Sequence, residues 1–207
     1  MSQSKFIFSA AKVLLVGLFC LSVSFAQSED NQLPKAEPSF DVIMQTIVAS
    51  NSPSDKSALP QTLSGVVKKL KSTYPLSNYN LTSTYLQRVA NTGNLELKNV
   101  SSQTYQDISS PIFSEWTLGQ FLALPNAQGT NSIQIRNFRF NQKVPIKTLA
   151  GKDSEGKPTF STVYESIGMT MQKISLSENV PTVIGSLTTS RPDEIMFLIL
   201  TVKSVEN

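Results

Sequence analysis

The chain has 207 residues, with 18 lysines and arginines against 15 aspartates and glutamates, no histidine, and a single cysteine, Cys20. The missing imidazoles exclude the usual base of serine and cysteine nucleophiles and, together with the scarcity of thiols, the common transition-metal ligands. Nucleic-acid binding needs a concentrated cationic face. Because the charges here are few and mixed in sign, we expect no nucleic acid as a partner.

Residues 1–26 have the pattern of a signal peptide. Lys5 and Lys12 supply the basic region, an apolar run follows over residues 13–23, and residues 24–26 (Ser-Phe-Ala) fit a small-x-small cleavage site. The apolar run is shorter than the about 20 residues that span a bilayer. We therefore expect cleavage near Ala26, a mature chain without a transmembrane span, and a periplasmic or secreted location. Removal of both lysines lowers the net charge from +3 to about +1.

The segment after the leader begins with a tether and continues into regular structure. Residues 27–39 are polar and contain two prolines, which predicts a flexible linker. The β-branched run at residues 40–48 predicts a buried strand. One amphipathic helix is predicted to begin near Pro60 and end before Pro75. Its apolar residues recur at helical spacing, at Leu63, Val66, Val67 and Leu70.

Two further strands are predicted after the helix. Residues 79–89 and 95–100 have strand composition and flank the turn sequence Asn-Thr-Gly-Asn at residues 91–94, which predicts a hairpin. Residues 40–100 therefore read as a small α+β unit of strand, helix, strand and strand. In such a unit the helix covers one face of a sheet.

Residues 101–207 are predicted to be β-rich, with strands at 112–122, 132–140, 162–176, 182–187 and 194–205. The apolar alternation changes parity near Arg136 and Asn137, which predicts a β-bulge, and residues 151–158 predict an exposed hairpin tip. The last strand is apolar on both faces, so it should be central. The fold class is α+β and β-rich: a strand-helix-strand-strand unit followed by an antiparallel β-sandwich-like region, as two domains or as one.

The most suggestive binding pattern combines cationic and aromatic side chains. Arg136, Phe138, Arg139 and Phe140 alternate along one strand, and Trp116 lies on another. Such side chains can hold sugars, peptides or bases through stacking and hydrogen bonds. The competing interpretation, which we favour, is an ordinary amphipathic strand with Phe138, Phe140 and Trp116 in the core.

Catalytic chemistry has only isolated candidates. Ser154 and Lys157 have the S-x-x-K spacing of serine acyl-transferases, but they fall in the predicted hairpin tip and the companion motifs are missing. Glu115 and Glu165 are the best carboxylate pair for glycoside hydrolysis, although solvent-facing strand positions explain both. We therefore expect no catalytic residue and no enzymatic activity.

Metal binding is equally weakly supported. Asp153 and Glu155 are the best oxygen ligands for a hard cation, but a full EF-hand register is absent and two lysines share the segment. A glycine-rich phosphate loop is also missing from the sequence. We expect neither a metal site nor a cofactor.

A local resemblance links the end of the chain to a known class. The segment from Glu178 to Ser186, followed by the apolar strand at 195–202, resembles the closing hairpin of bacterial secretin and pilus-assembly proteins, in which a turn, a β-branched run and a glycine precede a final strand. Ser186 stands where those families usually have a second glycine. The resemblance covers only Glu178 to Val202 and implies an accessory role in the cell envelope, without a catalytic residue.

The sequence thus predicts an exported, non-enzymatic envelope protein whose partners are other envelope proteins. Strand addition at an exposed sheet edge is the expected mechanism. A second hypothesis is a β-sandwich that binds a small ligand or polysaccharide through Arg136, Arg139 and Trp116. The third is a carboxylate-dependent hydrolase that uses Glu115 and Glu165.

Overall fold

The computed structural model describes residues 37–52, 59–101, 110–125, 131–189 and 193–205, all of which fall in one compact unit. The predicted signal peptide, its cleavage site and residues 27–36 of the predicted linker lie outside the described residues. Among the described residues, no helix is long and apolar enough to cross a membrane.

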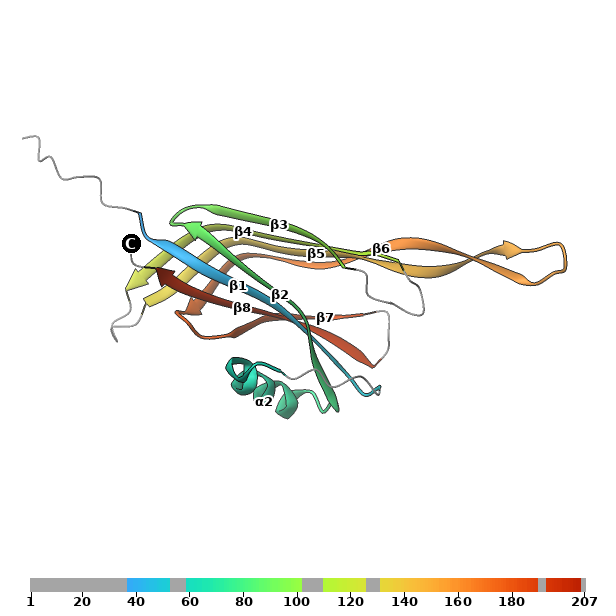
Figure 1. Ribbon diagram of the computed structural model, residues 1–207, viewed down its shortest axis with the longest axis horizontal. Helices are drawn as coiled ribbons and strands as arrows, with labels where there is room; N and C mark the ends of the chain where they lie inside the picture. The colour runs from blue at the N-terminus through green and yellow to red at the C-terminus, as the bar shows by residue number, and fades with distance from the viewer. Residues whose placement is uncertain (1–36, 53–58, 102–109, 126–130, 190–192, 206–207) are drawn as a thin grey trace, which may run out of the picture. The chain divides into compact units, whose positions relative to one another are not determined.

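Two antiparallel four-stranded sheets form the fold and confirm the predicted β-rich α+β class (Figure 1). The first sheet has the order β2-β1-β8-β7 and the second β3-β4-β5-β6. The elements are β1 (Ser39–Ser50), η1 (Gln61–Leu63), α2 (Ser64–Thr73), β2 (Asn78–Ala90), β3 (Asn94–Ser101), β4 (Ile112–Pro125), β5 (Asn131–Lys152), β6 (Pro158–Ser177), β7 (Thr182–Thr188) and β8 (Glu194–Val205). Because β1 pairs with β8, the two ends of the described chain share one sheet.

The predicted central strand is confirmed as β8, which lies between β1 and β7. One face of β8 contributes Leu198 and Leu200 to the core between the sheets, and the other contributes Phe197 and Ile199 to the core beneath the helix. All four side chains are fully buried. Two buried faces explain why the sequence of this strand is continuously apolar.

The predicted helix is confirmed as η1 and α2, and it covers the outer face of the first sheet. Leu63, Val66, Val67 and Leu70 pack against β1, β2 and β8 in one cluster that includes Phe197 of β8. The ring of Tyr74 meets Phe197 edge-on, with the ring centroids 5.1 Å apart. The lysines of α2 lie on its exposed side, as expected for an amphipathic helix.

The predicted hairpin of residues 79–100 is wrong. β2 and β3 follow each other through a tight turn, but β2 pairs with β1, and β3 pairs with β4 in the other sheet. The turn is bonded to both sheets, because the Asn91 N–H donates to the Pro38 carbonyl and the Thr92 N–H donates to the Phe121 carbonyl. A Cβ on Gly93 would lie 2.8 Å from the Ala90 carbonyl oxygen, so only glycine fits. The turn therefore folds one strand over the other across the core.

The predicted β-bulge is confirmed within β5. Asn137 has a φ of 60°, and the register of β4 on β5 shifts opposite it. Ile133 and Ile135 before the bulge and Phe138 and Phe140 after it all enter the same core. The left-handed residue thus restores both apolar pairs to one face of the sheet.

Candidate functional site

The three aromatic residues of the predicted binding pattern lie in the core between the sheets. Trp116, Phe138 and Phe140 are at most 1% exposed. The Trp116 ring contacts both phenylalanines edge-on, with centroid distances of 6.0 Å to Phe138 and 4.7 Å to Phe140. Their faces are filled by one another and by the surrounding core, so a ligand from solvent does not reach them.

The two arginines of that pattern are separated from the rings. Arg136 and Arg139 are exposed, and strand alternation places them on the outer face of the second sheet while the rings point inward. The five residues therefore do not form one surface. The interpretation as an amphipathic strand accounts for all of them.

The candidate carboxylate pair is also divided by the sheet. Glu115 on β4 lies opposite Asn141 of β5, and Glu165 on β6 lies opposite Val144. Asn141 and Val144 differ by an odd number of positions, so the two carboxylates project from opposite faces. They cannot flank one glycosidic bond, which requires two carboxyl groups on either side of the same sugar.

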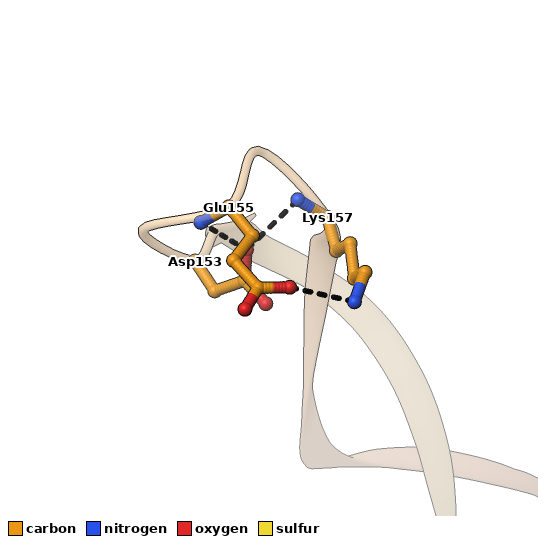
Figure 2. Close-up of polar contacts among 3 residues, drawn as sticks. All are labelled: Asp153, Glu155 and Lys157. Carbon is orange, nitrogen blue, oxygen red and sulfur yellow. Dashed lines mark hydrogen bonds and ion pairs between the residues drawn. The ribbon is translucent and has the colours of Figure 1, made fainter.

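The predicted hairpin tip is confirmed, and its carboxylates serve the turn (Figure 2). Asp153 Oδ1 accepts the backbone N–H groups of Glu155 and Lys157, each at 2.9 Å. Lys157 Nζ donates to Glu155 Oε2 at 2.7 Å. Gly156 supplies the left-handed residue of the turn, with a φ of 79°. Within the described residues, no group of three or more acidic or cysteine side chains is placed to hold a metal ion.

Behind this tip, β5 and β6 form a two-stranded ribbon that we call the β-arm, residues 144–152 and 158–166. The last residue of β5 that pairs with β4 is Lys143, whereas pairing with β6 continues to Lys152. Figure 1 shows this ribbon in orange, running on past the ends of β3 and β4. Most of its side chains are exposed, including Leu149 at 67% and Phe160 at 61%. An isolated two-stranded ribbon is only marginally stable in water.

The two edges of the β-arm differ in chemistry. The β5 edge carries Pro145, Lys147 and Lys152, and proline and lysine are the residues that block pairing with a further strand. The β6 edge carries one charged residue, Glu165, between Pro158 and Gln172. Its threonine, valine and aromatic residues favour strand pairing. Only the β6 edge is therefore chemically open to another strand.

The other sheet edges in the described structure are less suited to pairing. β7 has only seven residues and a register shift at Val183 and Gly185, and β3 has eight with an ion pair between Glu96 and Lys98. The register of β2 shifts between Thr46 and Ile47 of its neighbour β1. β6 has 20 residues, and its register with β5 shifts only at the tip, between Leu149 and Gly151.

An outer groove of about 480 Å³ lies at the base of the β-arm. The rings of Phe113 and Tyr164 meet edge-on in it, with centroids 5.7 Å apart, and both are more than 40% exposed. Lys98 hydrogen bonds to Glu96 at 2.7 Å, which raises the pKa of the lysine and lowers that of the glutamate. The groove is lined by Lys98, Asn99, Val100, Phe113, Ser114, Glu115, Asn141, Lys143 and Tyr164.

A hydroxyl cleft of about 200 Å³ opens between the two sheets. Neutral hydrogen-bonding groups dominate it: the Asn99 amide donates to the Tyr85 hydroxyl at 2.6 Å, and the Gln142 amide donates to the Ser114 hydroxyl at 3.0 Å. Amides and hydroxyls at this density suit a neutral polyhydroxylated molecule. The cleft is lined by Thr46, Thr82, Ser83, Thr84, Tyr85, Asn99, Ser101, Ser114 and Gln142.

Two carboxylates with perturbed pKa values lie outside these features. A two-pronged hydrogen bond from Arg88 at 2.7 and 3.1 Å lowers the pKa of Asp41 on the neighbouring strand. Hydrogen bonding from Ser204 lowers the pKa of Glu178, whose Oε1 accepts the Ser204 N–H at 2.8 Å. Both contacts join strands or close turns, so they have structural roles.

Sequence reasoning missed the β-arm because it ended the strand at residue 140. Val144, Ile146 and Thr148 continue the alternation of Phe138 and Phe140, but Pro145 interrupts the usual strand signal. The proline is tolerated because, among the described residues, β5 has β6 as its sole neighbour from that point. Alternation carried through Pro145 would have found the longer strand.

The structure thus defines a two-sheet, helix-covered fold with a projecting β-arm. No family model matches the chain, and no curated protein matches it. Among solved structures, it is similar to the secretin domain β-barrel of InvG from the Salmonella SPI-1 injectisome, with 8% identity and a TM-score of 0.33 over 95% of this chain and 68% of that chain. A likeness of this size carries no argument about fold or function.

Proposed function

We propose that the chain is an exported, non-enzymatic interaction protein that acts in the cell envelope by pairing the β6 edge of the β-arm with a strand of another protein. The observation that carries the proposal is the unprotected edge of β6, which offers unpaired backbone groups on a ribbon exposed on both faces. The leader pattern supports export, and the dispersal of the candidate catalytic residues supports the absence of enzymatic activity.

Strand addition also accounts for the asymmetry of the β-arm. The β5 edge has lysines and a proline, whereas the β6 edge has a long run with Glu165 as its one charge. A ribbon that only had to remain soluble would be protected on both edges. A third strand on β6 would satisfy its backbone groups and stabilise a ribbon that is marginal by itself.

The test places a photoreactive amino acid at position 162 of β6 in cells that produce the protein. The matched control places it at Lys147, which lies directly opposite Thr162 on β5 and therefore at the same height on the β-arm. We expect covalent adducts with a protein partner from position 162 and few from position 147. Equal yields at both positions, or none at either, would contradict strand addition, and substrate turnover by the purified chain would contradict the non-enzymatic assignment.

The hydroxyl cleft supports a second candidate function, the binding of a neutral glycan or polyol. Titration of the chain with neutral oligosaccharides would shift the resonances of the Asn99 and Gln142 side-chain amides, and Gln142→Ala would abolish the response. Asn141→Ala is the matched control, because Asn141 neighbours Gln142 but lines the outer groove. Unchanged amide resonances at millimolar ligand would remove this candidate.

A further inference from the structure

We propose that the strand that occupies the β6 edge is β6 of a second copy of this chain, paired antiparallel about a twofold axis through Thr162. This inference rests on the proposed function, because it names the partner of the same edge. It is carried by the order of side chains along the exposed part of β6, Pro158 to Ser166, which is complementary to itself in one register.

The faces of the β-arm restrict the possible registers. Pairing with β5 places Phe160 opposite Leu149 and Tyr164 opposite Pro145, so both rings lie on the outer face of the ribbon. A twofold axis normal to the sheet keeps outer residues opposite outer residues. It must therefore lie midway between the two copies of one β6 residue, which we describe as an axis through that residue. The candidate registers therefore differ by which residue stands at the axis.

An axis through Thr162 pairs the two aromatic residues. It sets Phe160 of each copy opposite Tyr164 of the other, which gives two aromatic cross-strand pairs on one face of a four-stranded ribbon. Such directly opposed pairs stabilise antiparallel sheets. Axes through the adjacent residues 161 or 163 leave each ring opposite a threonine, serine or proline.

The charges are compatible with the same register. Glu165 falls opposite Thr159 of the second copy, so no like charges face each other across the new strand pair. Lys157, which directly precedes β6, falls diagonal to Glu165 of the second copy and on the same face. The lysines of the β5 edge remain on the two outer edges of the assembled ribbon, where they block further addition and limit the assembly to two copies.

A cysteine cross-link tests the register directly. Cys20 is the one native cysteine and lies in the leader, so Thr162→Cys introduces a single thiol into the mature chain. Directly opposed Cβ atoms lie about 4.5–5.5 Å apart in antiparallel pairs, within reach of a disulfide or a short bismaleimide. We expect Thr162→Cys to give a cross-linked dimer. Lys147→Cys should not, because it lies one strand further from the axis in each copy, about 10 Å more in total.

Charge exchange provides an independent test in solution. Phe160→Lys combined with Tyr164→Lys sets lysines opposite lysines, and Phe160→Glu with Tyr164→Glu does the same with carboxylates. Each variant should raise the dimer dissociation constant in sedimentation equilibrium at least tenfold, and an equimolar mixture of the two should restore the dimer. Leu149→Lys is the matched control, because Leu149 is equally exposed and on the same face but lies on β5.

The outcomes separate this inference from the function on which it rests. A monomeric parent chain, or a Thr162→Cys variant that cross-links no better than Lys147→Cys, overturns self-pairing. If the photoreactive group at position 162 then captures a different protein, strand addition stands and the second copy is excluded as the partner. If it captures neither, both proposals fail. An adduct of twice the mass of the chain, lost in the double-lysine variant, supports both.

Discussion

Three glycines in different surroundings provide a test of the packing described above. Gly65 lies in α2, and a Cβ added there meets nothing within 4 Å. Gly168 lies in β6 at the base of the β-arm, where an added Cβ would collide with the carbonyl oxygen of Phe140 on the neighbouring strand. Gly185 lies in β7, where the obstacle is the end of the Met169 side chain. Substitution by alanine should therefore have three different effects.

The magnitudes follow from what each methyl group meets. Gly65→Ala should stabilise the chain by about 0.5–1 kcal/mol, because alanine has the higher helix propensity. Gly168→Ala should destabilise it by about 1–3 kcal/mol, because a carbonyl held in the sheet ladder cannot rotate away. Gly185→Ala should cost less than about 1 kcal/mol, because a methionine thioether can adopt another rotamer. In a domain of this size, 1 kcal/mol shifts Tm by about 2–4 °C.

Thermal and urea denaturation of the three variants, followed by circular dichroism, measures these differences. An unchanged m-value shows that the comparison concerns the same two-state transition. If Gly168→Ala were as stable as the parent, β6 could not approach β5 as closely as described. If Gly65→Ala were destabilising, the exposed face assigned to α2 would be incorrect.

Three further predictions concern Trp116 in the core, the carboxylate of Glu178 and Asp153 in the hairpin tip. Trp116→Phe should lower the free energy of unfolding by less than about 2 kcal/mol, because the indole N–H that it removes is buried without a hydrogen-bond partner in the described structure. Trp116→Ala should lower it by about 3–5 kcal/mol, and equal losses of the two variants in urea denaturation would contradict this. Glu178→Gln should lower stability at pH 7 by about 0.5–1 kcal/mol. Because Ser204 lowers the pKa of Glu178, the stabilisation from its carboxylate is present above the unfolded pKa and is lost as the pH falls through the folded pKa. In thermal scans the difference in Tm between variant and parent should therefore shrink as the pH is lowered below the unfolded pKa. Asp153→Ala should accelerate amide hydrogen exchange at Lys157 by about tenfold with unchanged global stability, and a loss of global stability would show that the β-arm is part of the cooperative core.

The sequence was sufficient for most elements but not for how they pair. Composition and periodicity identified β1, the helix, β7 and β8. The doubly apolar sequence of β8 also identified its central place, because a strand buried on both faces is apolar at every position. The turn after β2 has no comparable signal in the sequence. Its Gly93 fits a hairpin as well as an arch, and the choice depends on bonds to Pro38 and Phe121, which are distant in sequence.

The candidate site was harder to predict for a related reason. Trp116, Phe138 and Phe140 are conspicuous in the sequence because they are large, and large aromatic residues belong most often to a core. The exposed surfaces depend on where β4 stops and β5 continues, which is a property of strand length and not of composition. Phe113 and Tyr164 lie on different strands and come together only through that register.

The antiparallel pairing of β1 with β8 has a consequence for how the chain matures. Ser39 is registered with Val205, so the first sheet lacks one of its two central strands until residues 194–205 have emerged. Until then, the apolar faces of newly made β1 and β2 stay uncovered. Pairing β1 with β8 closes a loop that contains almost every other element, and such closure is slow. The chain therefore stays unfolded for longer after β1 and β2 are made, and loss of β8 alone would leave both β1 and β7 without their shared neighbour.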